Sequence, residues 1–93
     1  MNYLDLLNAL AKVAKPSHLD YIPVESMDTP FIDTSIDSLD GLLILMFMSM
    51  VYDVDDDLGK DFNPATPQEL YDFCQQHKKR DPESIEWAVE LCK

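Results

Sequence analysis

Asp37-Ser38-Leu39-Asp40 opens the most apolar segment of this chain, the run from Gly41 to Tyr52, which contains no charged residue. Aspartate before such a run is typical of a helix start, because its carboxylate accepts a hydrogen bond from an N–H group that lacks a partner inside the helix. Asp40, three residues after Asp37, completes a box-like N-terminus. The pattern predicts a helix from Ser38 to Tyr52, with Asp37 as N-cap and Ser38 in the first turn.

This predicted helix is apolar on two sides. The first stripe has helical spacing and consists of Leu39, Leu42, Leu43, Met46 and Met50. The second consists of Ile44, Leu45, Met48, Val51 and Tyr52. A helix of this kind is buried on both sides or shows one side to a partner. Because full burial is difficult in so small a protein, we expect the first stripe to face a partner, an apolar ligand or a second copy of the chain.

The segment before Ser38 contains one amphipathic helix and a long connection. Apolar residues at helical spacing predict a helix from roughly Tyr3 to Lys15, with Asn2 as a cap and Pro16 as its stop. The connection that follows is unusually long for a compact domain. We expect it to fold back over the helices on its apolar side chains, which are Leu19, Tyr21, Ile22, Val24, Met27, Phe31 and Ile32.

Capping signals after Tyr52 predict three further helices. Leu58 and Phe62 are expected to anchor a short one. Thr66-Pro67-Gln68-Glu69 is the strongest helix start in the chain, with a threonine N-cap, proline next and glutamate at the third position. Lys78-Lys79-Arg80 is expected to complement the dipole at the end of that helix. Asp81-Pro82-Glu83-Ser84 begins a last helix by the same cap-and-proline pattern, so the chain is predicted to be all-α.

The charge of the chain restricts its partners. The formal net charge is −11, from 18 acidic and 7 basic residues among 93, and no Lys or Arg occurs from Pro16 to Gly59. This sign disfavours nucleic acid and favours partners with basic patches. The N-terminus lacks a basic region followed by an apolar one, and the central apolar run is too short to cross a bilayer, so we expect a cytoplasmic protein with no signal peptide and no membrane span.

The residue patterns point to no catalytic or metal centre. Ser38 is not in a G-x-S-x-G motif and has no evident base or orienting partner. Cys74 and Cys92 form no zinc-ligand spacing. The acidic run Asp53 to Gly59 is similar to an EF-hand loop, but its glycine comes one place late and Pro64 stands where the glutamate is required. A weak surface cation site is the alternative there.

The order of these segments resembles the acyl carrier protein family, which includes peptidyl carriers. The resemblance spans roughly residues 1–79. It rests on Phe31-x-Asp33-x-x-Ile36-Asp37-Ser38-Leu39-Asp40 and on Tyr52-Asp53-Val54 at the end of the central helix. It implies a small four-helix bundle with a long first loop, here followed by an extra C-terminal helix, residues 80–93, packed on the same domain.

The resemblance also implies a function. Ser38, flanked by Asp37 and Leu39, is expected to be the attachment point for 4′-phosphopantetheine, which a phosphopantetheinyl transferase moves from coenzyme A with Mg²⁺. The thiol of the arm then holds acyl groups as thioesters for the acyl-transfer, condensing or reducing enzymes of fatty-acid, polyketide or related specialised biosynthesis. The protein is then a carrier and not an enzyme. The alternative is an acidic interaction module with a carrier-like fold that receives no phosphopantetheine.

Three departures from the family pattern refine these expectations. Ser35 stands where carriers commonly have glycine, two residues before Asp37. The central helix lacks the acidic face that the family shows to its enzymes, so we expect partner contacts through Leu39, Asp40, Leu42, Leu43, Met46 and Met50. These predict a dedicated partner with an apolar groove, or a dimer through this helix, and replacement of Leu43 and Met50 by glutamate is expected to weaken the complex. The segment from Asp81 onward, with Trp87, extends past the usual end.

Overall fold

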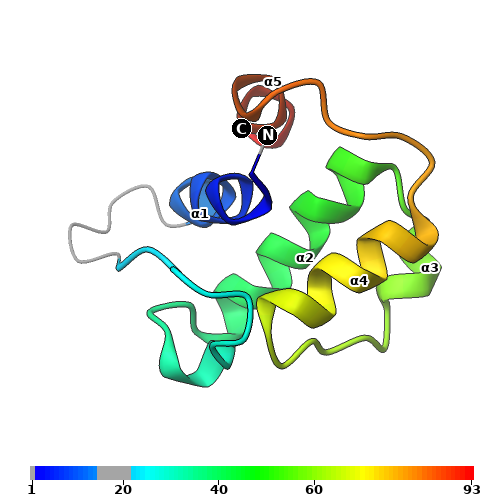
Figure 1. Ribbon diagram of the computed structural model, residues 1–93. Helices are drawn as coiled ribbons and strands as arrows, with labels where there is room; N and C mark the ends of the chain where they lie inside the picture. The colour runs from blue at the N-terminus through cyan, green and yellow to red at the C-terminus, as the bar shows by residue number, and fades with distance from the viewer. Residues whose placement is uncertain (1, 15–21) are drawn as a thin grey trace.

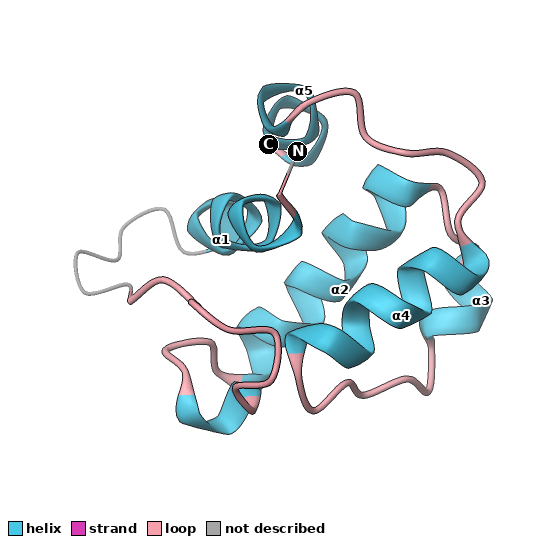
Figure 2. Cartoon of the chain, in the orientation of Figure 1, coloured by secondary structure: helices cyan, strands magenta, loops and turns pink. Residues whose placement is uncertain are grey.

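Five α-helices and one short 3₁₀ helix make up the secondary structure of the computed structural model, which describes residues 2–14 and 22–93. Over these residues no strand occurs (Figure 2). The elements are α1 (Tyr3–Ala14), η1 (Phe31–Asp33), α2 (Ser38–Tyr52), α3 (Asp56–Gly59), α4 (Pro67–His77) and α5 (Ile85–Cys92). The radius of gyration is 12.0 Å, close to the value of about 12 Å for a compact domain of this length. The prediction of an all-α chain is confirmed.

Helix α2 is the centre of the arrangement, because it contacts α1, α3, α4 and α5. Helix α4 runs beside it, while α1 and α5 lie against another side (Figure 1). The second apolar stripe faces these helices, and all five of its residues are buried: Ile44, Leu45, Met48, Val51 and Tyr52. The core is completed by Leu6, Leu7, Leu10 and Ala11 of α1, Leu70 and Cys74 of α4, and Ala88 and Cys92 of α5.

Two of the predicted helix starts are observed as the sequence indicates. The Asn2 side chain accepts a hydrogen bond from the N–H of Leu4 (2.8 Å) at the start of α1. The Thr66 hydroxyl accepts from the N–H of Glu69 (3.2 Å), and the Glu69 carboxylate accepts from the N–H of Ala65 (3.2 Å). This reciprocal pair is a capping box displaced by one residue, and it fixes the first turn of α4.

Helix α5 begins later than the sequence pattern indicates. Its N-cap is Ser84, whose hydroxyl accepts from the N–H of Trp87 (3.0 Å). The prediction that Asp81 and Pro82 start this helix is wrong. The Asp81 carboxylate instead accepts a hydrogen bond from the Lys78 ammonium (2.8 Å), so it lies outside the first turn. The helix itself packs against α1 and α2, and therefore shares one core with residues 2–14 and 38–52.

Arg80 binds the end of α2 and not the end of α4. Its Nε donates to the carbonyl of Val51 (3.1 Å), and its terminal nitrogen donates to the carbonyl of Met50. The guanidinium also lies 5.0 Å from the centre of the Trp87 ring. The last carbonyls of a helix lack intrahelical partners and have a negative partial charge, which explains why they attract this cation. The prediction that Arg80 complements the end of α4 is therefore wrong, while Lys78 is the C-cap residue of that helix.

The connection before α2 is held to the helices at separate points. The Asn8 side chain donates to the carbonyl of Val24 (2.9 Å) and accepts from its N–H (2.8 Å). Val24 is buried, and the N–H of Phe31 donates to Ala65 (2.8 Å) just before α4. Ile22 and Ile32 are exposed, which contradicts their predicted anchoring role. Lys15, Leu19 and Tyr21 lie outside the described residues.

Candidate functional site

Ser38 is the first residue of α2 and is exposed. The Asp37 carboxylate accepts a hydrogen bond from the N–H of Asp40 (2.9 Å), and the Asp37 carbonyl accepts from the N–H of Gly41 (2.8 Å). Asp37 has extended backbone (φ −82°, ψ 178°), as an N-cap residue normally does. The predicted start of the helix and the predicted N-cap are both confirmed.

The segment that leads into Ser38 is fixed by two hydroxyl groups. The Thr34 hydroxyl donates to the carbonyl of Phe31 (2.6 Å) and accepts from the N–H of Ile36 (3.2 Å), and Ile36 is buried. The Ser35 hydroxyl donates to the carbonyl of Ile22 (3.4 Å) and accepts from its N–H (3.3 Å). Ser35 does not have the left-handed backbone conformation that requires glycine, so serine is accommodated there. Sequence reasoning missed both sets of contacts, and the bonds of Ser35 to Ile22 join residues 13 positions apart.

The electrostatic surroundings of Ser38 combine two opposing effects. The N-terminus of α2 has a positive partial charge that favours an anion. Asp33 and Asp37 are exposed nearby in sequence, and no basic residue lies between them and Lys60. An anionic group at Ser38 would be stabilised by the helix terminus and repelled by these carboxylates.

The first apolar stripe of α2 is exposed along the helix. The exposed fractions are 67% for Leu39, 64% for Leu42, 49% for Met46 and 39% for Met50. The structure therefore places four large apolar side chains on one face that begins beside Ser38. Isolated apolar residues are normal on a protein surface, whereas an aligned exposed group is a feature found at many interaction sites.

Two residues of the predicted partner-binding set do not share this exposure. Asp40 is buried, with 8% of its surface exposed, which argues against a direct contact with a partner. Leu43 is half-buried and packs against the core. Glutamate at position 43 would therefore disturb folding as well as docking, so Leu42 and Met46 are the better positions for testing the surface.

Helix capping at Asp37 gives a stability prediction. Replacing Asp37 with alanine is expected to lower the free energy of unfolding by about 1 kcal/mol, because the N–H of Asp40 loses its acceptor. Asp37→Asn keeps an acceptor oxygen and is expected to retain most of the stability. Urea unfolding followed by circular dichroism measures both variants, and equal losses in the two would show that the carboxylate charge matters more than the hydrogen bond.

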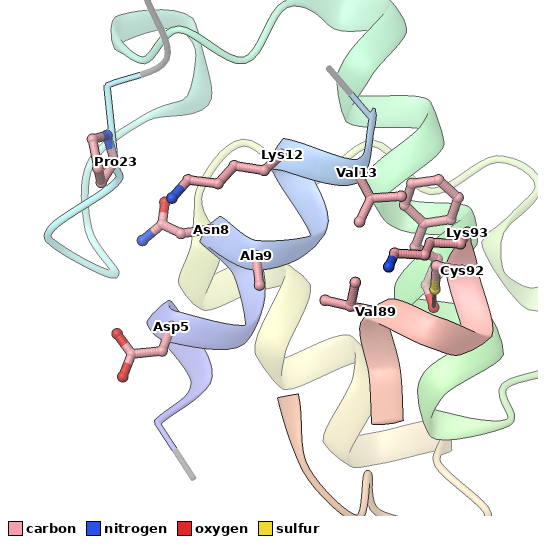
Figure 3. Close-up of a pocket in the computed structure, with 10 residues that line it drawn as sticks. Asp5, Asn8, Ala9, Lys12, Val13, Pro23, Val89, Cys92 and Lys93 are labelled. Atoms are coloured by element: carbon pink, nitrogen blue, oxygen red, sulfur yellow. Dashed lines mark hydrogen bonds between the residues drawn. The ribbon is translucent and has the colours of Figure 1, made fainter. Parts of the chain in front are cut away.

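A surface hollow of about 960 Å³ is lined mainly by residues of α1 and α5, together with Pro23 and Phe47. Figure 3 shows Ala9, Lys12 and Val13 of α1 and Val89 and Cys92 of α5 among its lining residues, together with Lys93. A second cavity of about 310 Å³ is lined in part by Tyr3, Tyr52 and Tyr71. The lining of neither hollow includes a residue from the first turn of α2.

Burial suppresses the reactivity of both cysteine thiols. It raises the pKa of Cys74 to about 12 and also raises the pKa of Cys92. The thiolate is the reactive form of cysteine, so both side chains are poor nucleophiles at neutral pH. Burial likewise raises the pKa of Tyr52 to about 12. Among residues 2–14 and 22–93, no cluster of three or more potential metal ligands is found.

The described part of the chain contains no helix with the length and apolar character needed to span a membrane. Comparison of the sequence and structure with protein-family models, with curated proteins and with solved structures finds no match. The functional assignment therefore depends on the geometry of the site and on the sequence pattern around Ser38.

Proposed function

We propose that this chain is a carrier protein of the acyl-carrier type, with 4′-phosphopantetheine attached to Ser38. The main support is the exposed serine at the first position of α2, next to an exposed apolar face, on a small all-helical domain. An enzyme that modifies or unloads a carrier must reach the attachment point, so exposure is the first requirement. The Asp37-Ser38-Leu39-Asp40 segment of the sequence provides the second line of support.

The loading reaction requires a hydroxyl nucleophile from the carrier and catalysis from a separate transferase. The Ser38 oxygen attacks the phosphorus of coenzyme A that is bonded to pantetheine, and a new phosphodiester bond forms. The pyrophosphate bond of coenzyme A breaks, so adenosine 3′,5′-bisphosphate leaves and the hydroxyl proton passes to a base of the transferase. Mg²⁺ held by the transferase stabilises the phosphate charge, which is useful beside the carboxylates of Asp33 and Asp37.

A tethered arm would give this carrier its function. The thiol at the end of the arm forms a thioester with an acyl group, and the tether raises the effective concentration of that group at each docked enzyme. Because Cys74 and Cys92 are buried, the thiol of the arm would be the most reactive one in the folded molecule. The partners are the transferase and the acyl-transfer, condensing or reducing enzymes of a dedicated pathway.

The exposed face of α2 is proposed as the docking surface for these enzymes. Its contacts would come from Leu39, Leu42, Met46 and Met50, and methionine side chains adapt readily to an apolar groove. Pairing of two copies through this face is less favourable, since each chain has a net charge of −11 and the two copies would repel each other. A basic rim around the groove of a partner enzyme would have the opposite effect.

Mass measurement tests the proposal directly. The protein is incubated with coenzyme A, Mg²⁺ and a broad-specificity phosphopantetheinyl transferase, and is then weighed by mass spectrometry. The expected result is a gain of one phosphopantetheine that is absent from Ser38→Ala. No gain with several transferases would contradict the proposal. Gain in both proteins would place the modification at a different residue.

Thiol reactivity gives a second, independent readout. The folded, unloaded protein is expected to react slowly with a thiol reagent at pH 8, because burial raises the pKa of both cysteines. The loaded protein is expected to gain one fast-reacting thiol per chain. A fast reaction before loading would mean that the cysteines are accessible, and the mass measurement would then be the only usable readout.

An interaction module that receives no phosphopantetheine is the second candidate. It is favoured by the same exposed apolar face and by the charge of −11, which together suit a basic, apolar partner surface without any role for Ser38. The two candidates differ at Ser38. For the interaction module, Ser38→Ala would leave binding of its partner unchanged, and loading would fail in every variant.

A further inference from the structure

Gly41 is a glycine inside α2 that the packing of the described residues does not require. Glycine destabilises a helix interior relative to alanine. A Cβ atom added at Gly41 would meet no atom within 4 Å among the described residues, apart from its chain neighbours and the backbone of its own helix. Its backbone also lies outside the left-handed region that favours glycine. Alanine would therefore fit this position among residues 2–14 and 22–93.

Gly59, the second glycine of the chain, provides a contrast. A Cβ atom at Gly59 would lie 3.9 Å from side-chain atoms of Leu45, Ser49 and Phe73, at ordinary contact distance. A side chain at position 59 would therefore contact side chains of α2 and α4 without a clash, and alanine is accommodated there. A Cβ atom at Gly41 would have no such neighbours among the described residues, so their packing does not explain its small size.

The position of Gly41 on the helix relates it to Ser38. With 3.6 residues per turn, Gly41 and Leu42 are the two residues of the next turn that flank Ser38, about 60° to one side and about 40° to the other. Side chains of a helix tilt toward its N-terminus, so a side chain at position 41 would cover the surface over the first turn. The Ser38 hydroxyl thus has an exposed leucine on one side and bare backbone on the other.

We propose that Gly41 determines access to Ser38, because its missing side chain leaves room for the enzyme that loads or unloads the serine. This inference rests on the proposed carrier function. The two flanking positions then have different roles: Leu42 makes an apolar contact with the enzyme, and Gly41 leaves space for the enzyme beside Ser38. A side chain at position 41 would hold the enzyme away from the hydroxyl, and the effect would increase with its size.

A size series at position 41 tests the inference. The full chain with Gly41 replaced by alanine, leucine or phenylalanine is loaded from coenzyme A by the same transferase, and kcat and KM for the carrier are measured. Gly41→Ala is expected to keep kcat/KM within about threefold and to raise Tm by about 4 °C, since alanine favours the helix. Gly41→Leu and Gly41→Phe are expected to lower kcat/KM at least tenfold, mainly by raising KM. Gly59→Ala is the matched control and is expected to load normally.

The series measures stability and loading separately, which distinguishes a role of Gly41 in access to Ser38 from a role in folding. A purely structural role for Gly41 would predict that stability and loading change together. If alanine alone caused the full loss, flexibility of the helix start would be the cause and the inference would be overturned. Normal loading of Gly41→Phe would also overturn it, while leaving the carrier function intact. Failure of the unmodified chain to load would overturn the carrier function and this inference with it.

Discussion

A chain shortened to end at Lys79 is expected to lose about 5 kcal/mol or more of its free energy of unfolding. The shortening removes α5, whose Ala88 and Cys92 are buried against α1 and α2. Burial of each apolar side chain contributes about 1.5–3 kcal/mol when it is large, and Ile85, Val89, Leu91 and Trp87 are also packed against the core. It also removes Arg80, whose hydrogen bonds to α2 add a smaller contribution because its side chain is exposed to solvent.

This loss is comparable with the whole stability of a typical small domain, about 5–15 kcal/mol. Urea unfolding followed by circular dichroism measures it, and removal of Lys93 alone is the control, because that exposed residue lies after the last turn of α5. If the chain of residues 1–79 unfolded at the same urea concentration as the full chain, the carrier-like part would be complete without α5. Unfolding at a much lower concentration would make α5 an essential part of the domain.

Local patterns in the sequence predicted most of the fold. Periodicity and caps located α1, α2 and α4 closely, because Asn2, Asp37 and Thr66 each bond to an N–H group two or three residues later. These are interactions within one turn, and sequence spacing specifies them fully. The buried stripe of α2 was identified for the same reason, since a helix repeats every 3.6 residues whatever surrounds it.

Contacts between distant segments were not predictable in the same way. Arg80 was assigned to the end of α4, yet it binds carbonyls of Met50 and Val51, about thirty residues earlier. Asp81 and Ser84 are both common N-cap residues; in the folded chain Ser84 caps α5, while Asp81 pairs with Lys78. The hydrogen bonds of Asn8 to Val24 likewise depend on where the connection passes over α1.

In the candidate site, too, some features were predictable from the local sequence and others were not. Exposure of Ser38 and the N-cap role of Asp37 were expected from the helix start, and exposure of the first stripe followed from the size of the domain. The burial of Asp40 was not expected, because a carboxylate in a first turn normally faces solvent. Gly41 was also overlooked, although a glycine beside the candidate serine in an otherwise strong helix is a visible signal in the sequence.

Replacing Leu42 and Met46 together with glutamate is expected to lower kcat/KM for loading of Ser38 by about a hundredfold. Both side chains are exposed on the face of α2 that begins at Ser38. An enzyme seated on Ser38 would cover this face, and each glutamate would remove an apolar contact and place a carboxylate in an apolar groove. Two losses of about 1.4 kcal/mol each correspond to the hundredfold effect, which should be seen mainly in KM.

Three controls define the cause of that effect. Leu42→Met with Met46→Leu keeps the apolar surface and is expected to load within about threefold of the unmodified chain. Gln76→Glu adds an exposed charge on α4, away from the face, and is expected to have no effect. Urea unfolding of the double glutamate variant is expected to be nearly unchanged, since both positions are exposed in the folded protein.

The salt dependence of loading distinguishes apolar docking from long-range repulsion. Repulsion between the added carboxylates and an acidic enzyme surface would be screened at high ionic strength, so loading of the double variant would recover. Loss of an apolar contact would persist in salt, because burial of apolar surface does not depend on screened charges. Persistent loss with intact folding would establish the face of α2 as the docking surface, whereas full recovery in salt, or normal loading throughout, would show that the enzyme approaches Ser38 from another side.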